Sequence, residues 1–336
     1  NDMFIIGKLM HRLMAQLINR ENDREVLKPG KVGNLMRVYE DKPIYYDNWD
    51  IDIYYTEKSW DVTDLQSFVW TEMGPVRATL RVERKFSHST IVQDIRFYAN
   101  LRRIDLETTV DWHEHQHLLK VHFPADVHTD EATFEIQYGN VTRKTHRNTS
   151  WDRARFESCG QKWVDVSEGH YGVSLLNDCK YGHSVQDACI GLTLIKSGIE
   201  PNPTTDQEVH YFTYSLYPHA ETWKAAGTVP QAFFLNQPAL AVRGGTPGES
   251  FGLAAVSASN VVLETVKRAE DGDGVILRMY ECENARTPVT LTWNRPFASA
   301  ESCNCLEEAD GQPVKVEGNR VSFTIKPFEI KTIRIR

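Results

Sequence analysis

The chain lacks an apolar segment long enough to cross a bilayer as a helix, and it lacks an excess of positive charge. A spanning helix needs about 20 consecutive apolar residues, and the longest apolar runs are far shorter. The formal net charge of the 336 residues is −8. Because phosphate backbones bind to basic faces, nucleic acid is not expected as a main partner. The sequence therefore predicts neither a membrane helix nor a nucleic-acid-binding function.

Cysteine is scarce and irregularly spaced, with six residues in the whole chain. No CxxC pair is present, and Cys303 and Cys305 stand too close together for an ordinary zinc knuckle. A low cysteine density in a large chain favours a reducing compartment in which thiols stay free. We therefore expect a cytoplasmic protein.

Motifs of self-contained catalytic sites are also missing. The sequence has no GxSxG elbow, no HExxH zinc motif and no phosphate-binding GxxxxGK[ST] loop. No two carboxylates stand out as the acid and nucleophile of a glycosidase. A mutarotase-type activity would need an acid–base pair such as His with Glu, and no motif marks one. No catalytic residue is predicted.

Alternation of apolar and polar residues is the dominant pattern that is present. Apolar residues occupy every second position from Val76 to Val82, and similar runs lie at 103–112, 321–325 and 331–336. Period two indicates strands with one buried and one solvated face. Many such runs between turn-forming clusters are typical of an antiparallel sandwich, and no regular βα alternation supports a doubly wound fold. The chain is predicted to be all-β.

Two regions bear on its organisation. Residues 5–18 fit either a helical stripe or two strands joined near residues 11–12, and we favour two strands because turn residues follow. Gly and Pro are dense at 236–249, which indicates a linker. We predict a large β domain at 1–235 and a smaller one at 250–336.

Three alternating histidines, His113, His115 and His117, could form a metal site. On a strand they would share one face, about 6–7 Å apart along the chain. Imidazoles so placed can hold zinc when a further ligand closes the site. The alternative is a solvated strand face, which we favour, so no metal site is predicted.

Two other segments combine polar and aromatic residues. Within 39–52, the rings of Tyr45, Tyr46 and Trp49 alternate with carboxylates, as in sites that stack on a sugar and accept from its hydroxyls. An edge loop with capping residues is an equal alternative. In the stretch 174–185 an apolar run is followed directly by a polar turn. This pattern indicates either the end of a strand or a loop over a polar ligand.

An ordered set of motifs along nearly the whole chain resembles the C-terminal region of glycoside hydrolase family 38, the α-mannosidases. The resemblance is greatest to the branch with cytosolic and many bacterial enzymes. Its main parts are Gly33–Leu35, Tyr39–Pro43, Asp47–Asp52, Arg103–Trp112, Asn148–Asp152, Lys162–Asp165, Tyr217–His219, Arg278–Glu281 and Pro327–Thr332.

The resemblance implies a large galactose-mutarotase-like antiparallel β-sandwich followed by a smaller β-sandwich. Family members carry an N-terminal catalytic domain with zinc, a nucleophile and an acid, and this chain lacks those parts. It is thus expected to support the catalytic domain of a retaining, zinc-dependent enzyme that hydrolyses terminal α-mannosides in oligosaccharides, and to be inactive alone. Neither cofactor nor metal is expected within the chain itself.

The resemblance also implies which residues border the sugar cleft, because loops of the large β domain face it. These are Asp178, Lys180, Tyr181 and Gly182, together with Asp47, Trp49 and Asp50. Cys179 stands where other branches carry Arg. Lys180 therefore either supplies the positive charge that this Arg would provide or has a structural role alone. Gly182 fits a positive φ or a close backbone approach. Stabilising the domain interface is the alternative role for all of them.

The expected partners are the missing catalytic domain and a mannose-containing oligosaccharide. Exposure of the docking surface further predicts self-association into a homo-oligomer. The Trp- and Tyr-rich loops motivate one alternative function, a stand-alone carbohydrate-binding module.

Overall fold

The computed structural model describes residues 4–10, 13–244, 248 and 250–336. The chain divides into two units, one of Asn1–Glu135 with Val141–Ala239 and one of Ile136–Asn140 with Leu240–Arg336. Helix is limited to η1 (Ile53–Glu57), α1 (Ser150–Ala154) and α2 (Thr228–Asn236) in the described residues. The prediction of an all-β chain is confirmed.

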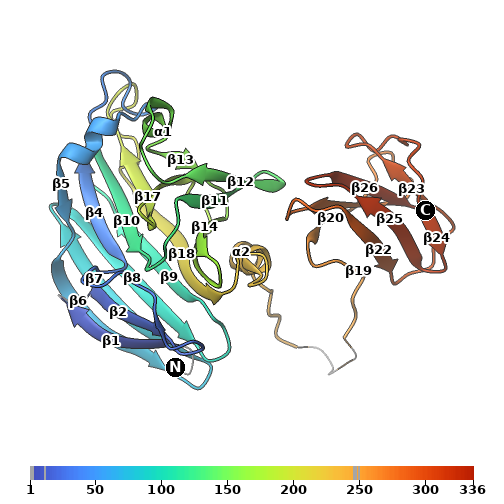
Figure 1. Ribbon diagram of the computed structural model, residues 1–336, viewed down its shortest axis with the longest axis horizontal. Coiled ribbons are helices and arrows are strands. Elements are labelled where there is room, and N and C mark those ends of the chain that lie inside the picture. Colours follow the sequence, from blue (N-terminus) through green and yellow to red (C-terminus); the bar gives the residue numbers. More distant parts are fainter. Residues whose placement is uncertain (1–3, 11–12, 245–247, 249) are drawn as a thin grey trace. The chain divides into compact units, whose positions relative to one another are not determined.

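A nine-stranded antiparallel sheet dominates the first unit (Figure 1). From edge to edge its strands are β12 (Gly139–Lys144), β11 (Glu131–Ile136), β14 (Trp163–Glu168), β15 (Tyr171–Asn177), β18 (Val209–Ala220), β9 (Ile104–Asp111), β8 (Ser89–Tyr98), β7 (Arg77–Phe86) and β6 (Asp64–Met73). Helix α2 packs against β14 and β15.

Two further antiparallel sheets complete this unit. The six-stranded sheet runs in the order β13 (Ser158–Cys159), β16 (Gly182–Gln186), β17 (Cys189–Ser197), β10 (His117–Pro124), β4 (Leu35–Glu40) and β5 (Ser59–Asp61). The three-stranded sheet contains β1 (Phe4–Met10), β2 (Leu13–Asn19) and β3 (Arg24–Glu25). Strands β1 and β2 confirm the choice of strands over a helix for residues 5–18. Their predicted joint at residues 11–12 lies outside the described residues.

One apolar core fills the space between the nine- and six-stranded sheets. Leu80 and Val82 of β7 share it with Leu119 and Val121 of β10, and all four are buried. Alternate residues of β7 and β8 point into it, so these strands keep one face inside and one face outside, whereas β15 is buried along its whole length. Burying one such side chain contributes about 1.5–3 kcal/mol. This pattern made the strands predictable from sequence.

The second unit is a smaller sandwich of two four-stranded antiparallel sheets. One sheet runs β19 (Ala254–Val256), β22 (Thr287–Trp293), β25 (Arg320–Ile325) and β24 (Lys315–Glu317), and the other β20 (Val261–Arg268), β21 (Val275–Glu281), β26 (Ile330–Ile335) and β23 (Ala300–Cys303). Leu277, Met279, Leu291 and Ile333 are fully buried in the core between them. The predicted large sandwich followed by a smaller one is confirmed.

The prediction that His113, His115 and His117 share a strand face is wrong. Strand β9 ends at Asp111, and His117 begins β10, so the first two histidines lie in the connection. His117 Nδ1 lies 2.6 Å from the carbonyl oxygen of His115, a local contact across a turn. The three imidazoles therefore do not form a row.

A buried carboxylate explains this turn. Glu114 is buried, and its Oε1 accepts hydrogen bonds from His88 N at 2.9 Å and Ser89 Oγ at 2.9 Å. Gln116 then adopts φ 53°, which no strand residue does. The apparent alternation at 112–117 thus comes from a chain that turns inward at Glu114. Periodicity alone wrongly predicts a strand there.

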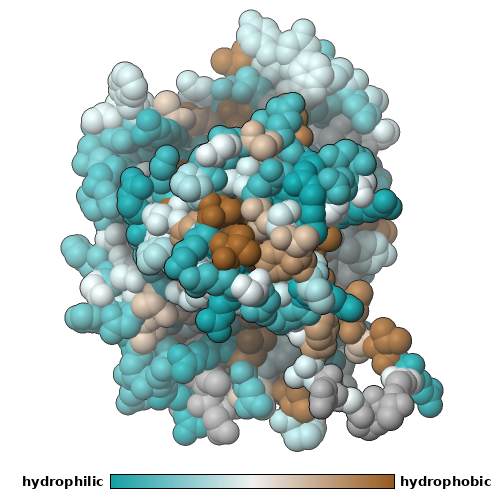
Figure 2. Space-filling view, turned by 90° about the vertical axis from the view of Figure 1, so that its right-hand side faces the viewer, coloured by the Kyte–Doolittle hydropathy of each residue, from teal (hydrophilic) through white to brown (hydrophobic). Residues whose placement is uncertain are grey.

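Two observations concern the hydropathy of the chain, one of its surface and one of its helices. The face drawn in Figure 2 is mainly hydrophilic, with a small central group of hydrophobic side chains. None of the described helices is long and apolar enough to cross a membrane.

Candidate functional site

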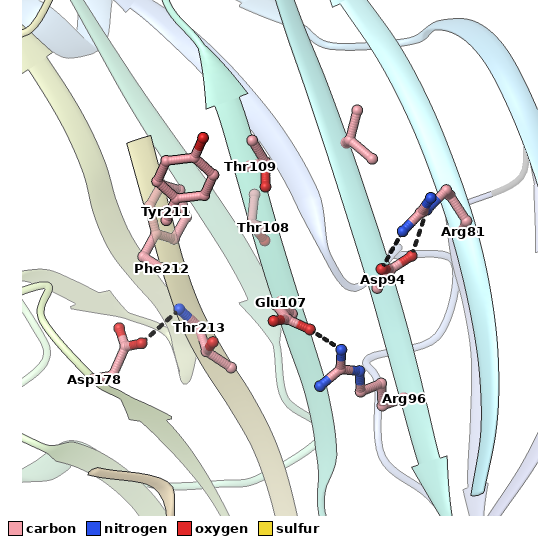
Figure 3. A pocket seen from close by; sticks show the side chains of 11 residues that line it. Arg81, Asp94, Arg96, Glu107, Thr108, Thr109, Asp178, Tyr211, Phe212 and Thr213 are labelled. Atoms are coloured by element: carbon pink, nitrogen blue, oxygen red, sulfur yellow. Dashed lines mark hydrogen bonds and ion pairs between the residues drawn. The ribbon is translucent and has the colours of Figure 1, made fainter. Parts of the chain in front are cut away.

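A polar pocket of about 290 Å³ lies on the outer face of the nine-stranded sheet (Figure 3). Its base comes from β7, β8, β9 and β18, and Asp178 closes one side. The lining residues are Arg81, Val92, Asp94, Arg96, Glu107, Thr108, Thr109, Asp178, Tyr211, Phe212 and Thr213. One predicted residue, Asp178, is therefore part of a pocket.

Ion pairs between neighbouring strands fix the charged wall of this pocket. Arg81 binds both carboxylate oxygens of Asp94, at 2.8 and 2.6 Å, and Arg96 pairs with Glu107. The hydrogen bond from Arg81 lowers the pKa of Asp94 below its usual value. Paired charges leave the wall close to neutral but rich in hydrogen-bonding groups. Such a wall suits a neutral polyhydroxylated ligand better than an ion.

Asp178 holds the β15–β16 turn against β18. Its Oδ2 accepts from Thr213 N at 2.9 Å, and its own N–H donates to the Thr213 carbonyl at 3.1 Å. Burial is the main cause that raises the pKa of the Cys179 thiol to about 11, and a hydrogen bond with Asp178 is the second cause. The thiol is therefore protonated at neutral pH. These contacts give Asp178 a structural role at the edge of the pocket.

The two residues that follow differ in their exposure, because Lys180 is partly buried and Tyr181 is exposed. Lys180 Nζ lies 4.6 Å from the ring centroid of Phe212, a cation–π contact at the pocket. Its backbone N–H donates to Asn177 Oδ1 at 2.7 Å, which completes the turn. Tyr181 is about half exposed. Lys180 therefore places its ammonium group beside Phe212, which lines the pocket.

Gly182 is closely packed and does not adopt a positive φ. It begins β16, pairs with Cys159, and is not among the positive-φ residues. A Cβ at this position would lie 3.1 Å from Thr193 Cβ and 3.3 Å from its Oγ1. The positive φ is therefore absent, and the close neighbour of Gly182 is the Thr193 side chain.

Asp47 is buried at 5% exposure and joins two loops. Its Oδ1 accepts from Ile199 N at 2.9 Å and Glu200 N at 2.7 Å, and its Oδ2 accepts from Gln116 Nε2 at 3.1 Å. Burial acts to raise the pKa of Asp47, but these hydrogen bonds lower it below its usual value overall. Asp47 therefore anchors the loop and presents no free carboxylate.

The anchored loop carries exposed rings. Trp49 is 74% exposed and Tyr45 71% exposed, and the rings of Trp49 and Tyr46 lie 5.4 Å apart. Asp50 is also exposed, and among the described residues its carboxylate accepts only from its neighbour Ile51 N, at 2.9 Å. No hydrogen bond or ion pair joins this loop to the Asp178–Gly182 turn in the described ranges. The structure thus places the predicted residues in two separate groups.

One group of side chains could hold a cation. The ligand atoms of Asp206, Glu208 and His210 all lie within 4.8 Å of one another. His210 Nε2 already lies 2.9 Å from the Asp206 carbonyl oxygen, and Glu208 is exposed. The sequence analysis did not single out this set, because its spacing matches no metal motif.

Comparison with known proteins gives these groups a context. The model of the glycosyl hydrolases family 38 C-terminal domain matches residues 12–204, which is more than half of the chain. The chain belongs to glycoside hydrolase family 38. The model of the family 38 C-terminal beta sandwich domain matches residues 260–333. The resemblance inferred from the sequence motifs is therefore confirmed.

Family 38 relatives are much longer than this chain. Alpha-mannosidase 2C1 of Homo sapiens is 35% identical over 328 residues, with 95% of this chain and 32% of the relative covered. Alpha-mannosidase G of Dictyostelium discoideum is 36% identical over 340 residues, with 96% and 31% covered. The chain thus spans about a third of these relatives.

A solved structure shows the same fold. The crystal structure of an alpha-mannosidase from Enterococcus faecalis V583 superposes with a TM-score of 0.77 at 18% identity. The superposition covers 96% of this chain and 40% of that protein. At such low identity the likeness concerns the fold alone.

The sequence analysis missed most of the pocket wall of this family 38 chain. Arg81, Asp94, Arg96 and Glu107 occupy the outward positions of β7, β8 and β9. Arg81 and Glu107 lie in runs predicted as strands, whereas Asp94 and Arg96 lie in a segment for which no strand was predicted. Predicting the wall would also have required the strand register, which pairs Arg81 with Asp94 and which the sequence does not state.

Proposed function

We propose that the chain is the C-terminal β region of a retaining, zinc-dependent α-mannosidase acting on terminal α-mannosides of oligosaccharides. It supports the catalytic domain, borders the sugar cleft and is inactive alone. The observation that carries this proposal is the ordered match of two C-terminal family models on a chain that covers about a third of longer α-mannosidases.

The site geometry supports an accessory role. Both oxygens of Asp47 and Oδ2 of Asp178 accept hydrogen bonds from other segments of the chain, three of the four from backbone N–H groups, so these carboxylates hold loops in place. We assign the zinc to the catalytic domain, and no step proposed for this chain involves it. The cytoplasmic location is part of the proposal and is supported by six cysteines that are all free.

Lys180 offers a test of the cleft role in a longer protein that contains the catalytic domain. If its cation borders the bound sugar, Lys180→Ala is expected to raise KM for a mannose oligosaccharide about fivefold with little change in kcat, a loss of about 1 kcal/mol. Steady-state kinetics measure this. Lys85→Ala, an exposed lysine on β7, is the matched control. An unchanged KM would assign Lys180 to the turn alone.

A carbohydrate-binding module is the second candidate function. The observation in its favour is the exposed group of Tyr45, Tyr46 and Trp49 on an anchored loop, since exposed rings stack on sugars. Calorimetric titration of the chain with mannose and mannobiose distinguishes the two. Under the accessory proposal, millimolar sugar gives no heat of binding. Saturable heat that Trp49→Ala abolishes would favour the module.

A further inference from the structure

A larger cavity, of about 650 Å³, opens on the outer face of the six-stranded sheet. Leu35 and Tyr39 of β4, His122 of β10 and Cys189 of β17 form its floor, and Tyr55 of η1 covers one side. These positions alternate with the residues that face the sandwich core. The cavity is therefore on the opposite sheet from the pocket at Asp178.

The rim of this cavity is cationic in an acidic protein. Lys28, Lys31, Arg37 and Arg147 line it, against one carboxylate residue, Asp187. The whole chain has a formal net charge of −8. Four cations around one hollow concentrate positive potential there, which raises the local concentration of anions.

Two of these cations have no partner of their own in the part of the chain that the structure describes. Lys28 Nζ donates to the Asp187 carbonyl, and Arg37 Nε pairs with Asp61 at 2.5 Å. Within the described ranges, neither Lys31 nor Arg147 forms an ion pair or a side-chain hydrogen bond. Both side chains are thus available to an anionic ligand.

The cations act on the cavity floor. Burial is the main influence on the Cys189 thiol and raises its pKa, while Lys28, Arg37, Lys120 and Lys31 act in the opposite direction. Charges from both the rim and the underlying sheet therefore converge near Cys189. An anion at this place would meet several positive groups at once.

The floor also offers neutral hydrogen-bonding groups. Tyr39 OH and His122 Nε2 lie 2.9 Å apart. Burial first, and then the charges of Lys120 and Arg37, lower the pKa of His122 to about 3, so the ring is neutral at physiological pH. Its other nitrogen, Nδ1, has no partner among the described residues and can bond to a hydroxyl.

A glycine keeps this part of the floor open. A Cβ on Gly191 would lie 2.6 Å from Ser184 Oγ and 3.2 Å from His122 Nδ1. Any larger side chain would therefore fill the space beside these two polar atoms. The hollow is shaped for hydroxyl groups at its floor and for an anion at its rim.

We propose that this cavity binds a phosphorylated monosaccharide, with the phosphate held by the unpaired rim cations and the sugar hydroxyls facing His122 and Ser184. Guanidinium and ammonium groups form strong charge-assisted hydrogen bonds with phosphate. The cavity volume falls within the range of about 300–1,000 Å³ typical of small-molecule sites, far more than a bare phosphate needs. This inference does not depend on the proposed mannosidase role.

Calorimetric titration of the chain with mannose 6-phosphate, mannose and inorganic phosphate tests the proposal. Mannose 6-phosphate is expected to bind at least about tenfold more tightly than either control, since each control lacks one half of the contacts. Failure of mannose 6-phosphate to bind would overturn the proposal. Equal affinity for inorganic phosphate would overturn the assignment of a sugar ester.

Two kinds of variant localise the binding. Lys31→Ala and Arg147→Ala are each expected to weaken mannose 6-phosphate about tenfold, the loss of one charge-assisted hydrogen bond. Lys85→Ala removes an exposed lysine of the other sheet and should leave the affinity unchanged. Gly191→Ser should block the sugar while circular dichroism confirms folding. Wild-type affinity in the Lys31→Ala, Arg147→Ala double variant would contradict the site.

Discussion

Replacing Asp47 with Ala is expected to lower the free energy of unfolding of the first unit by about 3 kcal/mol. The substitution leaves the N–H groups of Ile199 and Glu200 without their acceptor and frees Gln116 Nε2. Hydrogen bonds to a buried charged group are worth about 1.5–3 kcal/mol each, and part of the loss is recovered by water. Urea unfolding followed by tryptophan fluorescence measures it, because all but one of the eight tryptophans precede residue 235.

Asp50 provides the matched control for this prediction. It lies three residues away in the same loop and is exposed, and its carboxylate accepts a hydrogen bond from the neighbouring Ile51 N at 2.9 Å. Asp50→Ala should therefore change the free energy of unfolding by less than about 0.5 kcal/mol. If Asp47→Ala and Asp50→Ala proved equally mild, the anchoring role of Asp47 would be wrong.

The stability loss of Asp47→Ala should depend on pH. Hydrogen bonds hold the folded pKa of Asp47 below its unfolded value of about 3.9, so its stabilisation is complete above that pH. It declines as the pH falls through the folded pKa. The difference between wild type and Asp47→Ala should thus be constant near neutrality and shrink in acid.

The second large effect is expected from Glu157→Gln. Lys120 is fully buried at 0% exposure, and its Nζ pairs with Glu157 Oε1, which also accepts from Tyr55 OH at 2.7 Å. Removing the carboxylate leaves a buried ammonium without its counter-charge. Breaking such a pair from one side costs about 3–5 kcal/mol, which the same urea titration would show at neutral pH.

Two further measurements identify the cause of that loss. Burial lowers the pKa of Lys120 while Glu157 opposes this, so the variant's Lys120 should lose its proton more readily. The unfolded state then binds more protons, and the deficit should shrink as the pH rises toward about 10.4. Adding Lys120→Met to Glu157→Gln should restore much of the stability, because an apolar replacement needs no counter-charge. A double variant no better than the single one would contradict this explanation.

The fold could largely be predicted because each strand contains its own signal. Alternation at 76–84 and 321–325 reports which face of β7 and β25 is buried, and no distant residue is needed to see it. The same reasoning failed at 112–117, because Glu114 is buried by contacts with His88 and Ser89. A charged residue at an inward position looks, in sequence, like a solvated one.

The candidate site was less predictable because its contacts are long-range. Asp47 binds the backbone about 150 residues further along the chain, and Asp178 binds Thr213 across a strand pair. Such partners depend on register and loop packing. The family resemblance singled out these carboxylates, and the fold was needed to show that they hold loops in place.

We propose that this family 38 chain supports a catalytic domain and does not itself hydrolyse mannosides. Hydrolysis of an aryl α-mannoside should be measured with this chain and with a longer protein that includes the catalytic domain, side by side with added zinc. We expect turnover by the longer protein and none by the chain. Turnover by the purified chain would contradict this proposal, and the catalytic residues would then have to be sought among the side chains assigned structural roles.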